Sequence, residues 1–196
     1  MISLLPDLVL YPVTLNEQKK LFNLMMNIYR PVYQHLWWDD GSNYVESQFN
    51  EAQLQLELSN PNASYYFVHF KEEPIGILRF ICDSEINNIK ERNTTQLHRI
   101  YLDPLVHGQG IGRALMCWLI AFSITQNQQS IRLECMDTQL AAFHFYKQFG
   151  FKIVEAFQLD SPTMRSEMRG MLRMELNLNN SSCIQPPIAT IERYNL

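Results

Sequence analysis

Apolar side chains recur along this chain with two periods, and the period changes several times. Alternation, or a short apolar run between turn residues, predicts strands over 7–13, 64–70, 75–81, 94–102, 130–136, 151–159 and 171–178. Apolar side chains three and four residues apart predict helices over 15–30, 43–59, 111–125 and 138–149. Strands with helices between them predict an α/β fold with some parallel pairing.

Breaking residues set the expected ends of these elements. Pro31 is expected to end the first helix, because proline disrupts helical hydrogen bonding. The second helix is expected to run unbroken over 43–59 and to stop at Asn60 and Pro61. The polar segment 83–93 is expected to be a loop.

The sharpest local signal is a glycine-rich turn between a strand and a helix. The strand predicted over 94–102 leads to Pro104, and Gly108, Gly110 and Gly112 follow directly before an apolar helix. Alternating glycines let backbone N–H groups converge on an anion, and the helix N-terminus adds its positive dipole end. The turn is therefore interpreted as a cradle for a pyrophosphate.

Composition narrows the class of protein. The chain has 196 residues, 46% of them hydrophobic, which fits one domain with a packed core. A net charge of −4 without basic runs argues against nucleic-acid binding. The four cysteines form no C-x-x-C pair, so neither a zinc site nor a redox motif is expected. No apolar run is long enough to span a membrane and the N-terminus does not resemble a signal peptide, so a cytoplasmic protein is expected.

Three segments match motifs of a known family. Residues 107–115, His-Gly-Gln-Gly-Ile-Gly-Arg-Ala-Leu, resemble a Q/R-x-x-G-x-G/A pyrophosphate loop. Leu-Glu-Cys at 133–135 is similar to the family's fifth strand, and 142–151 fits its A-x-x-x-Y-x-x-x-G-F helix end. In this order and spacing, the chain resembles the GNAT superfamily of acyl-CoA-dependent N-acetyltransferases across about 64–178.

The resemblance implies a fold and a domain layout. The expected fold is α/β, with a mixed central sheet of about seven strands and helices on both faces. A V-shaped gap is expected between the two central parallel strands. Residues 1–178 would form a single N-acetyltransferase domain. Residues 179–196 turn polar and contain two prolines, and we expect them to form a C-terminal tail.

The resemblance also implies acetyl-CoA as co-substrate and no metal. His107 stands where the family usually has arginine or glutamine, and Gln139 stands where many members have asparagine. A histidine carries a positive charge only when protonated, so CoA affinity is expected to be weaker or pH-dependent. The residues expected to bind the cofactor are Ile100, Tyr101, Leu102, His107, Gly108, Gln109, Gly110, Ile111, Gly112, Arg113, Gln139, Phe143 and Tyr146.

The implied reaction is direct attack of an amine on the thioester in a ternary complex. By family position, Tyr146 is expected to protonate the departing thiolate, although a core aromatic is the structural alternative. Some relatives carry a carboxylate on the strand 94–102, and this chain has none there. His98 is the candidate general base, against a purely structural histidine, and Glu134 acting through water is the second candidate. The absence of a dedicated base is the third.

The aromatic and acidic connector before the second helix is the candidate acceptor site. Trp38, Asp39 and Asp40 combine an aromatic face with carboxylates, which suits a cation. The alternative is structural: Trp37 anchors the connector and an aspartate caps the helix. The preferred acceptor is a small-molecule amine. A protein or peptide amine, and a catalytically silent acyl-CoA sensor, remain open, as does a homodimer.

Overall fold

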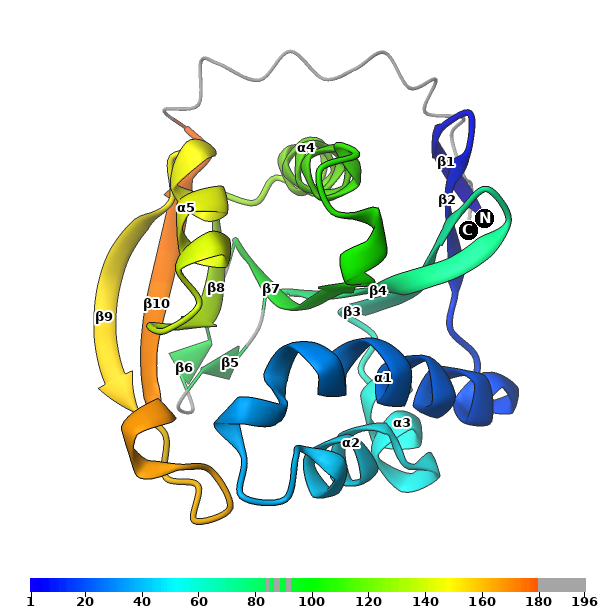
Figure 1. Ribbon diagram of the computed structural model, residues 1–196. Coiled ribbons are helices and arrows are strands. Elements are labelled where there is room, and N and C mark those ends of the chain that lie inside the picture. Colours follow the sequence, from blue (N-terminus) through cyan, green and yellow to red (C-terminus); the bar gives the residue numbers. More distant parts are fainter. Residues whose placement is uncertain (84, 87–88, 91–92, 180–196) are drawn as a thin grey trace.

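The computed structural model describes residues 1–83, 85–86, 89–90 and 93–179, and Figure 1 shows their arrangement. One eight-stranded sheet has the order β1-β2-β3-β4-β7-β8-β10-β9. Its strands are β1 (Ile2–Leu5), β2 (Leu8–Pro12), β3 (Ala63–Phe70), β4 (Glu73–Cys82), β7 (Thr94–Leu102), β8 (Ser130–Met136), β9 (Lys152–Gln158) and β10 (Gly170–Asn177). All neighbours pair antiparallel except β7 and β8, which are parallel. The mixed sheet is confirmed, with one strand more than expected.

Helices cover both faces of this sheet, as expected. They are α1 (Gln18–Tyr33), α2 (Ser42–Phe49), α3 (Glu51–Leu58), α4 (Ile111–Thr125) and α5 (Leu140–Gln148). In Figure 1, α4 lies on one side of the strands, and α1, α2 and α3 lie on the other. The short helix α5 stands beside β8 and β10.

Strand alternation divides the interior into two cores. Neighbouring residues of a strand point to opposite faces. On β3, Phe67 packs in the core under α1, α2 and α3, while Val68 packs in the core under α4. Ile77 and Leu78 divide in the same way on β4. Because both faces of these strands are buried, their sequences read as nearly continuous apolar runs.

Three expected boundaries were wrong. Helix α1 continues through Pro31, and the carbonyl of Arg30 still accepts the N–H of Gln34, so the helical geometry survives the proline. The second helix is two helices, because the side chain of Asn50 accepts the N–H of Gln53 at 2.8 Å and starts α3. The expected loop 83–93 contains β5 (Glu85–Ile86) and β6 (Ile89–Lys90), an antiparallel pair.

The parallel strands separate after a short contact. Their register runs from Thr94 opposite Ser130 to Leu97 opposite Leu133. In the described chain β7 continues to Leu102 and β8 to Met136 without further pairing between them. The expected V-shaped gap therefore opens beyond Leu97, and each strand leaves backbone groups unpaired along it.

Two findings concern the rest of the chain. Within the described ranges, no helix combines the length and the apolar character needed to cross a membrane. The N–H of Leu178 donates to the carbonyl of Gln129 at 2.8 Å, and the expected domain boundary at 178 stays a prediction. The expected tail lies outside the described residues, except for Asn179.

Candidate active site

A cavity of about 490 Å³ lies at the end of β7, between the glycine turn and α5. Its volume is within the ~300–1,000 Å³ usual for ligand sites. Its walls come from the end of β7, the glycine turn, the start of α4, one face of α5 and the last turns of α1. Eleven of the residues expected to bind the cofactor line it: Ile100, Tyr101, Leu102, His107, Gly108, Gly110, Ile111, Gly112, Arg113, Gln139 and Tyr146. We call this space the larger cavity.

The glycine turn has the geometry of an anion cradle. Gly108 and Gly110 both have φ near +77°, a conformation that costs a residue with a Cβ roughly 1–2 kcal/mol. A Cβ at either position would meet no described atom within 4 Å, so the backbone there is open to a ligand. Gly110 directly precedes α4, whose first N–H groups have no partner within the helix. These donors and the helix dipole suit a pyrophosphate.

Backbone donors also face the gap. The N–H of Asp103 donates to the carbonyl of Ile75 at 2.8 Å, which points it toward β4. Because the direction alternates along an antiparallel strand, the N–H groups of Ile100 and Leu102 point the opposite way, into the gap. These two groups are positioned to donate to a carbonyl oxygen bound between the strands.

A second cavity, of about 190 Å³, adjoins the first. Half of its lining residues are tyrosine, tryptophan, cysteine or methionine, and it also contains His98, Arg99 and Glu134. Six residues line both cavities: Tyr33, Ile100, Tyr101, Gln139, Ala142 and Tyr146. The two spaces therefore meet where the strands separate. We call this space the smaller cavity.

Tyr146 stands at that junction and keeps its proton. It lies on the inner face of α5 together with Gln139 and Ala142, three and four residues apart. Burial, and then the neighbouring Tyr33 and Cys135, raise the pKa of the Tyr146 phenol above its usual value. The group therefore carries a proton that it can donate, although it is a weaker acid than an exposed tyrosine.

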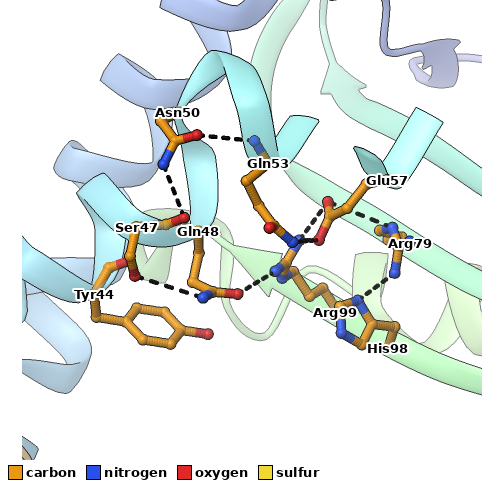
Figure 2. A network of polar contacts seen from close by, with 9 residues as sticks. All are labelled: Tyr44, Ser47, Gln48, Asn50, Gln53, Glu57, Arg79, His98 and Arg99. Carbon is orange, nitrogen blue, oxygen red and sulfur yellow. Dashed lines mark hydrogen bonds and ion pairs between the residues drawn. The ribbon is translucent and has the colours of Figure 1, made fainter. Parts of the chain in front are cut away.

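His98 has a fixed partner. Nη1 of Arg79 lies 2.6 Å from its Nδ1 (Figure 2). A guanidinium has hydrogens and no free acceptor, so Nδ1 is the acceptor of this bond. Desolvation of the ring, and then the charges of Arg99 and Arg79, lower the pKa of His98 well below its usual 6.5. This geometry does not favour the expected role of His98 as a general base.

Arg79, the partner of His98, belongs to a buried ionic network. Glu57 on α3 accepts two bonds of 2.8 Å from Nη1 of Arg99, and its Oε2 lies 3.5 Å from Nε of Arg79. Arg99 also donates to Gln48 on α2 at 2.8 Å (Figure 2). The side chains of Glu57, Arg79 and Arg99 are 5% exposed or less. Two guanidinium groups thus share one carboxylate beside the smaller cavity.

Glu134, the other expected base, is also engaged. Its Oε1 accepts from Nε and Nη2 of Arg173 at 3.0 and 2.8 Å. Arg173 lies opposite Glu134 on β10 and bonds Glu155 as well. The carboxylate lines the smaller cavity, but its charge is already paired. It can act on an amine only together with a bridging water.

The family model described as the acetyltransferase (GNAT) family matches residues 22–151. That range covers more than half of the chain and includes the glycine turn, both splayed strands and Tyr146. The chain belongs to the GNAT acetyltransferase family. The resemblance inferred from the glycine turn and the Tyr146–Gly150–Phe151 block is confirmed.

Individual relatives agree with this assignment. The chain is 28% identical over 113 residues to an uncharacterized N-acetyltransferase of Methanocaldococcus jannaschii, covering 58% of this chain and 50% of the relative. A similar protein of Schizosaccharomyces pombe is 26% identical over 134 residues, covering 61% of this chain and 78% of the relative. The chain spans about half the length of the first of these relatives.

Solved structures share the GNAT fold at low identity. The PaiA N-acetyltransferase of Thermoplasma acidophilum, solved with coenzyme A, matches with a TM-score of 0.66 at 16% identity. The match covers 87% of this chain and 99% of that one. A spermidine N-acetyltransferase of Vibrio cholerae, solved with CoA and spermine, matches with a TM-score of 0.64 at 18% identity, covering 88% and 96%. At this identity the comparison establishes the fold.

Some residues singled out from the sequence do not line the cavities of this GNAT domain. Gln109 and Phe143 are outside the larger cavity: the amide of Gln109 donates to the carbonyl of Leu105, and Phe143 packs beside His144. Phe145, one helical step away, lines it instead. Since four neighbouring residues of α5 are aromatic or histidine, composition could not indicate which one faces inward.

The expected acceptor residues have structural roles in the GNAT domain. Asp39 accepts the N–H of Asn43 at 2.8 Å, and Asp40 accepts from Ser42 and Arg30, so both cap the start of α2. Trp38 is 63% exposed, and Arg165 lies over its ring. None of the three lines the smaller cavity. The contacts of Asp39 and Asp40 with the start of α2 agree with the structural alternative for the aspartates, and their spacing from that helix was the signal for it.

One wall of the smaller cavity is aromatic, and no sequence pattern indicated it. Tyr29, Tyr33, Tyr44 and Tyr101 contact one another with ring centroids 4.6 to 5.8 Å apart. Trp37 stacks on Tyr44 at 4.9 Å and donates to the hydroxyl of Tyr29 at 3.2 Å. Helical spacing cannot separate a core face from a ligand-facing one, so the pattern of α1 alone does not indicate that Tyr29 and Tyr33 line a cavity.

Proposed function

We propose that this GNAT domain transfers an acetyl group from acetyl-CoA to the primary amine of a small molecule. The observation that carries the proposal is the junction of the two cavities at Tyr146, beside the separated strands. A thioester in the larger cavity and an amine in the smaller one would meet there. Holding two reactants in this way can lower a barrier by up to about 7–11 kcal/mol.

Each part of the site has a task in this reaction. The glycine turn and the first turn of α4 bind the pyrophosphate through backbone N–H groups. The N–H of Ile100 or Leu102 donates to the thioester oxygen as negative charge develops on it. Tyr146 gives its proton to the departing sulfur. The neutral amine nitrogen loses one proton to water, the sulfur gains one from Tyr146, and the Tyr146 phenolate regains a proton from water, so the products are an N-acetyl amide and a free thiol.

Removal of the amine proton is assigned to water, with Glu134 acting through it. His98 cannot take a proton at Nδ1 while Arg79 occupies that atom. Glu134 is the carboxylate among the described residues of the smaller cavity, and Arg173 fixes its orientation. A water between Glu134 and the nitrogen would carry the proton away without direct contact.

The size of the smaller cavity supports a small acceptor. At about 190 Å³ it is below the ~300 Å³ at which ligand sites usually begin. The spermidine N-acetyltransferase solved with CoA and spermine is a GNAT fold with a small amine, which supports the same substrate class. We expect the preferred acceptor to lie almost wholly within this space.

A coupled assay for free CoA tests the proposal. The protein is incubated with acetyl-CoA and a panel of amines that includes spermidine, aromatic amines, amino acid amides and a short peptide, with a no-acceptor control. Release of CoA that depends on a small amine is the expected result. Binding of acetyl-CoA without acceptor-dependent release would instead indicate an acyl-CoA sensor. Release with the peptide alone would indicate a peptide acetyltransferase.

A further inference from the structure

The bond between Arg79 and His98 determines which ring nitrogen carries the proton. Nη1 of Arg79 is 2.6 Å from Nδ1, and an arginine has only donors to offer. Nδ1 must therefore present its lone pair. In the neutral ring the proton then resides on Nε2, which becomes a hydrogen-bond donor.

The surroundings hold the ring in this neutral form. Arg79 on β4 and Arg99 on β7 face one carboxylate, Glu57 on α3, so the network already carries one excess positive charge (Figure 2). A protonated His98 would place a third cation against a single anion. It would also put a hydrogen on Nδ1, directly against the guanidinium of Arg79. Glu134 on β8 does not compensate this added positive charge, because it is already paired with Arg173.

His98 also lines the smaller cavity. The residue is exposed. It precedes Ile100 by two residues, at the point where the pairing of β7 with β4 shifts register, and both residues line the smaller cavity. The cavity therefore combines a donor at His98, a nearby excess of positive charge, and a carboxylate that is already paired. This arrangement disfavours polycations and favours an acceptor that presents an oxygen.

We propose that His98 is a hydrogen-bond donor that selects acceptor amines in which a carbonyl or carboxylate group is attached to the carbon that bears the amino group. The Nε2–H group of His98 binds an oxygen of that group while the nitrogen lies at the junction near Tyr146. Arg79 is a positioning residue, because it fixes the tautomer of His98 without touching the acceptor. The assignment rests on the proposed acetyl transfer and names its substrate class.

Three matched amines and two variants test the selection. The three amines are 2-phenylethylamine, phenylalaninamide and phenylalanine. They share one skeleton and differ in the group on the carbon that bears the amine, which is hydrogen, a carboxamide or a carboxylate. Since their basicities differ, the quantity to compare is the ratio of wild-type to variant kcat/KM for each amine. His98→Leu removes the donor. His98→Gln keeps an oxygen that can accept from Arg79 and an N–H₂ group that can donate, but it cannot act as a base.

The expected pattern depends on the oxygen. His98→Leu lowers kcat/KM about tenfold or more for phenylalaninamide and phenylalanine and less than threefold for 2-phenylethylamine, and His98→Gln restores most of the loss. His35→Gln is the matched control, because His35 is exposed and lines neither cavity. Equal losses for all three amines would overturn the proposal. The proposal would also be overturned if His98→Gln were as inactive as His98→Leu and its pH profile of kcat/KM had lost the acidic limb near pH 6.5, because loss of a general base has this effect.

A second measurement does not depend on turnover. Nitrogen-15 NMR of His98 is expected to show a proton on Nε2 and no titration between pH 5 and pH 8. Arg79→Met leaves Glu57 paired with Arg99, and it should bring the titration of His98 back toward pH 6.5. A proton on Nδ1, or an unchanged titration in Arg79→Met, would overturn the role of Arg79. If no amine released CoA from the wild-type protein, the proposed function would fail, while the NMR result would still decide the protonation of His98.

Discussion

Glu57→Gln is the substitution that tests the buried ionic network most directly. The glutamine keeps the size of the side chain but removes the only charge that Arg79 and Arg99 share within the described network. Two unit charges about 4 Å apart attract by about 4 kcal/mol at an effective dielectric constant near 20. Loss of both pairs therefore removes about 8 kcal/mol of attraction, and the repulsion between the guanidiniums remains.

The measured cost should be smaller than this gross attraction. Glutamine has a lower desolvation penalty than a carboxylate, by several kcal/mol, which offsets part of the loss. Breaking a buried ion pair by removing one partner typically costs about 3–5 kcal/mol. We expect that loss in the free energy of unfolding, from a total that is about 5–15 kcal/mol in ordinary domains.

Urea unfolding followed by circular dichroism measures the difference. With a slope near 2 kcal/mol per M, the midpoint should fall by about 2 M. Glu46→Gln on α2 is the matched control, because Glu46 is exposed, and its shift should stay within about 0.5 kcal/mol. The double variant Glu57→Gln with Arg79→Met should recover part of the loss, since one unpaired guanidinium remains instead of two. A urea midpoint of Glu57→Gln within about 0.3 M of the wild-type midpoint would refute this reasoning.

Three further predictions concern the site. Gly110→Asp should abolish acetyl-CoA binding in calorimetry, while Gly110→Asn, which tolerates the same φ of +77° without the charge, should bind far better; equal affinities would contradict the anion cradle. Tyr146→Phe should lower kcat for CoA release more than it changes KM, and an unchanged kcat would exclude the proposed proton donor. Because the folded state holds the pKa of His98 low, the unfolded state binds the extra proton below about pH 6.5, so stability should fall on acidification. Urea midpoints at pH 7.5 and pH 5 should differ less in His98→Gln than in wild type.

Local patterns predicted the elements around the glycine turn with matching bounds. The strand over 94–102, the helix over 111–125 and the strand over 130–136 lie where the spacing of apolar residues placed them. Gly108 and Gly110 have the positive φ that their place in a strand-to-helix turn indicated. These features depend on residues close together in sequence, so periodicity and backbone preference are sufficient to find them.

The roles of the charged residues could not be predicted from local patterns. Arg79 and His98 are 19 residues apart in the sequence, and Glu57 and Arg99 are 42 apart. An ion pair between distant elements leaves no periodic signal, so the sequence left open whether His98 is a general base or a structural histidine, and only the structure shows that its Nδ1 atom is occupied. Asp39 and Asp40 looked like an acceptor site for a related reason, since residue type does not tell whether a carboxylate faces a cavity or a helix end.

By itself, the sequence determined the strand, the glycine turn and the helix that follows it, on the side of the site proposed to bind acetyl-CoA, because these elements are contiguous in the chain. Only the tertiary structure decided the part of the site that is proposed to hold the acceptor amine. The smaller cavity is assembled from α1, β7, β8 and the segment around Met164, which meet only after the sheet has formed. The physical reason is the range of the forces involved. Backbone preferences act between neighbours in sequence, whereas the charge state and direction of His98 depend on side chains that folding brings together.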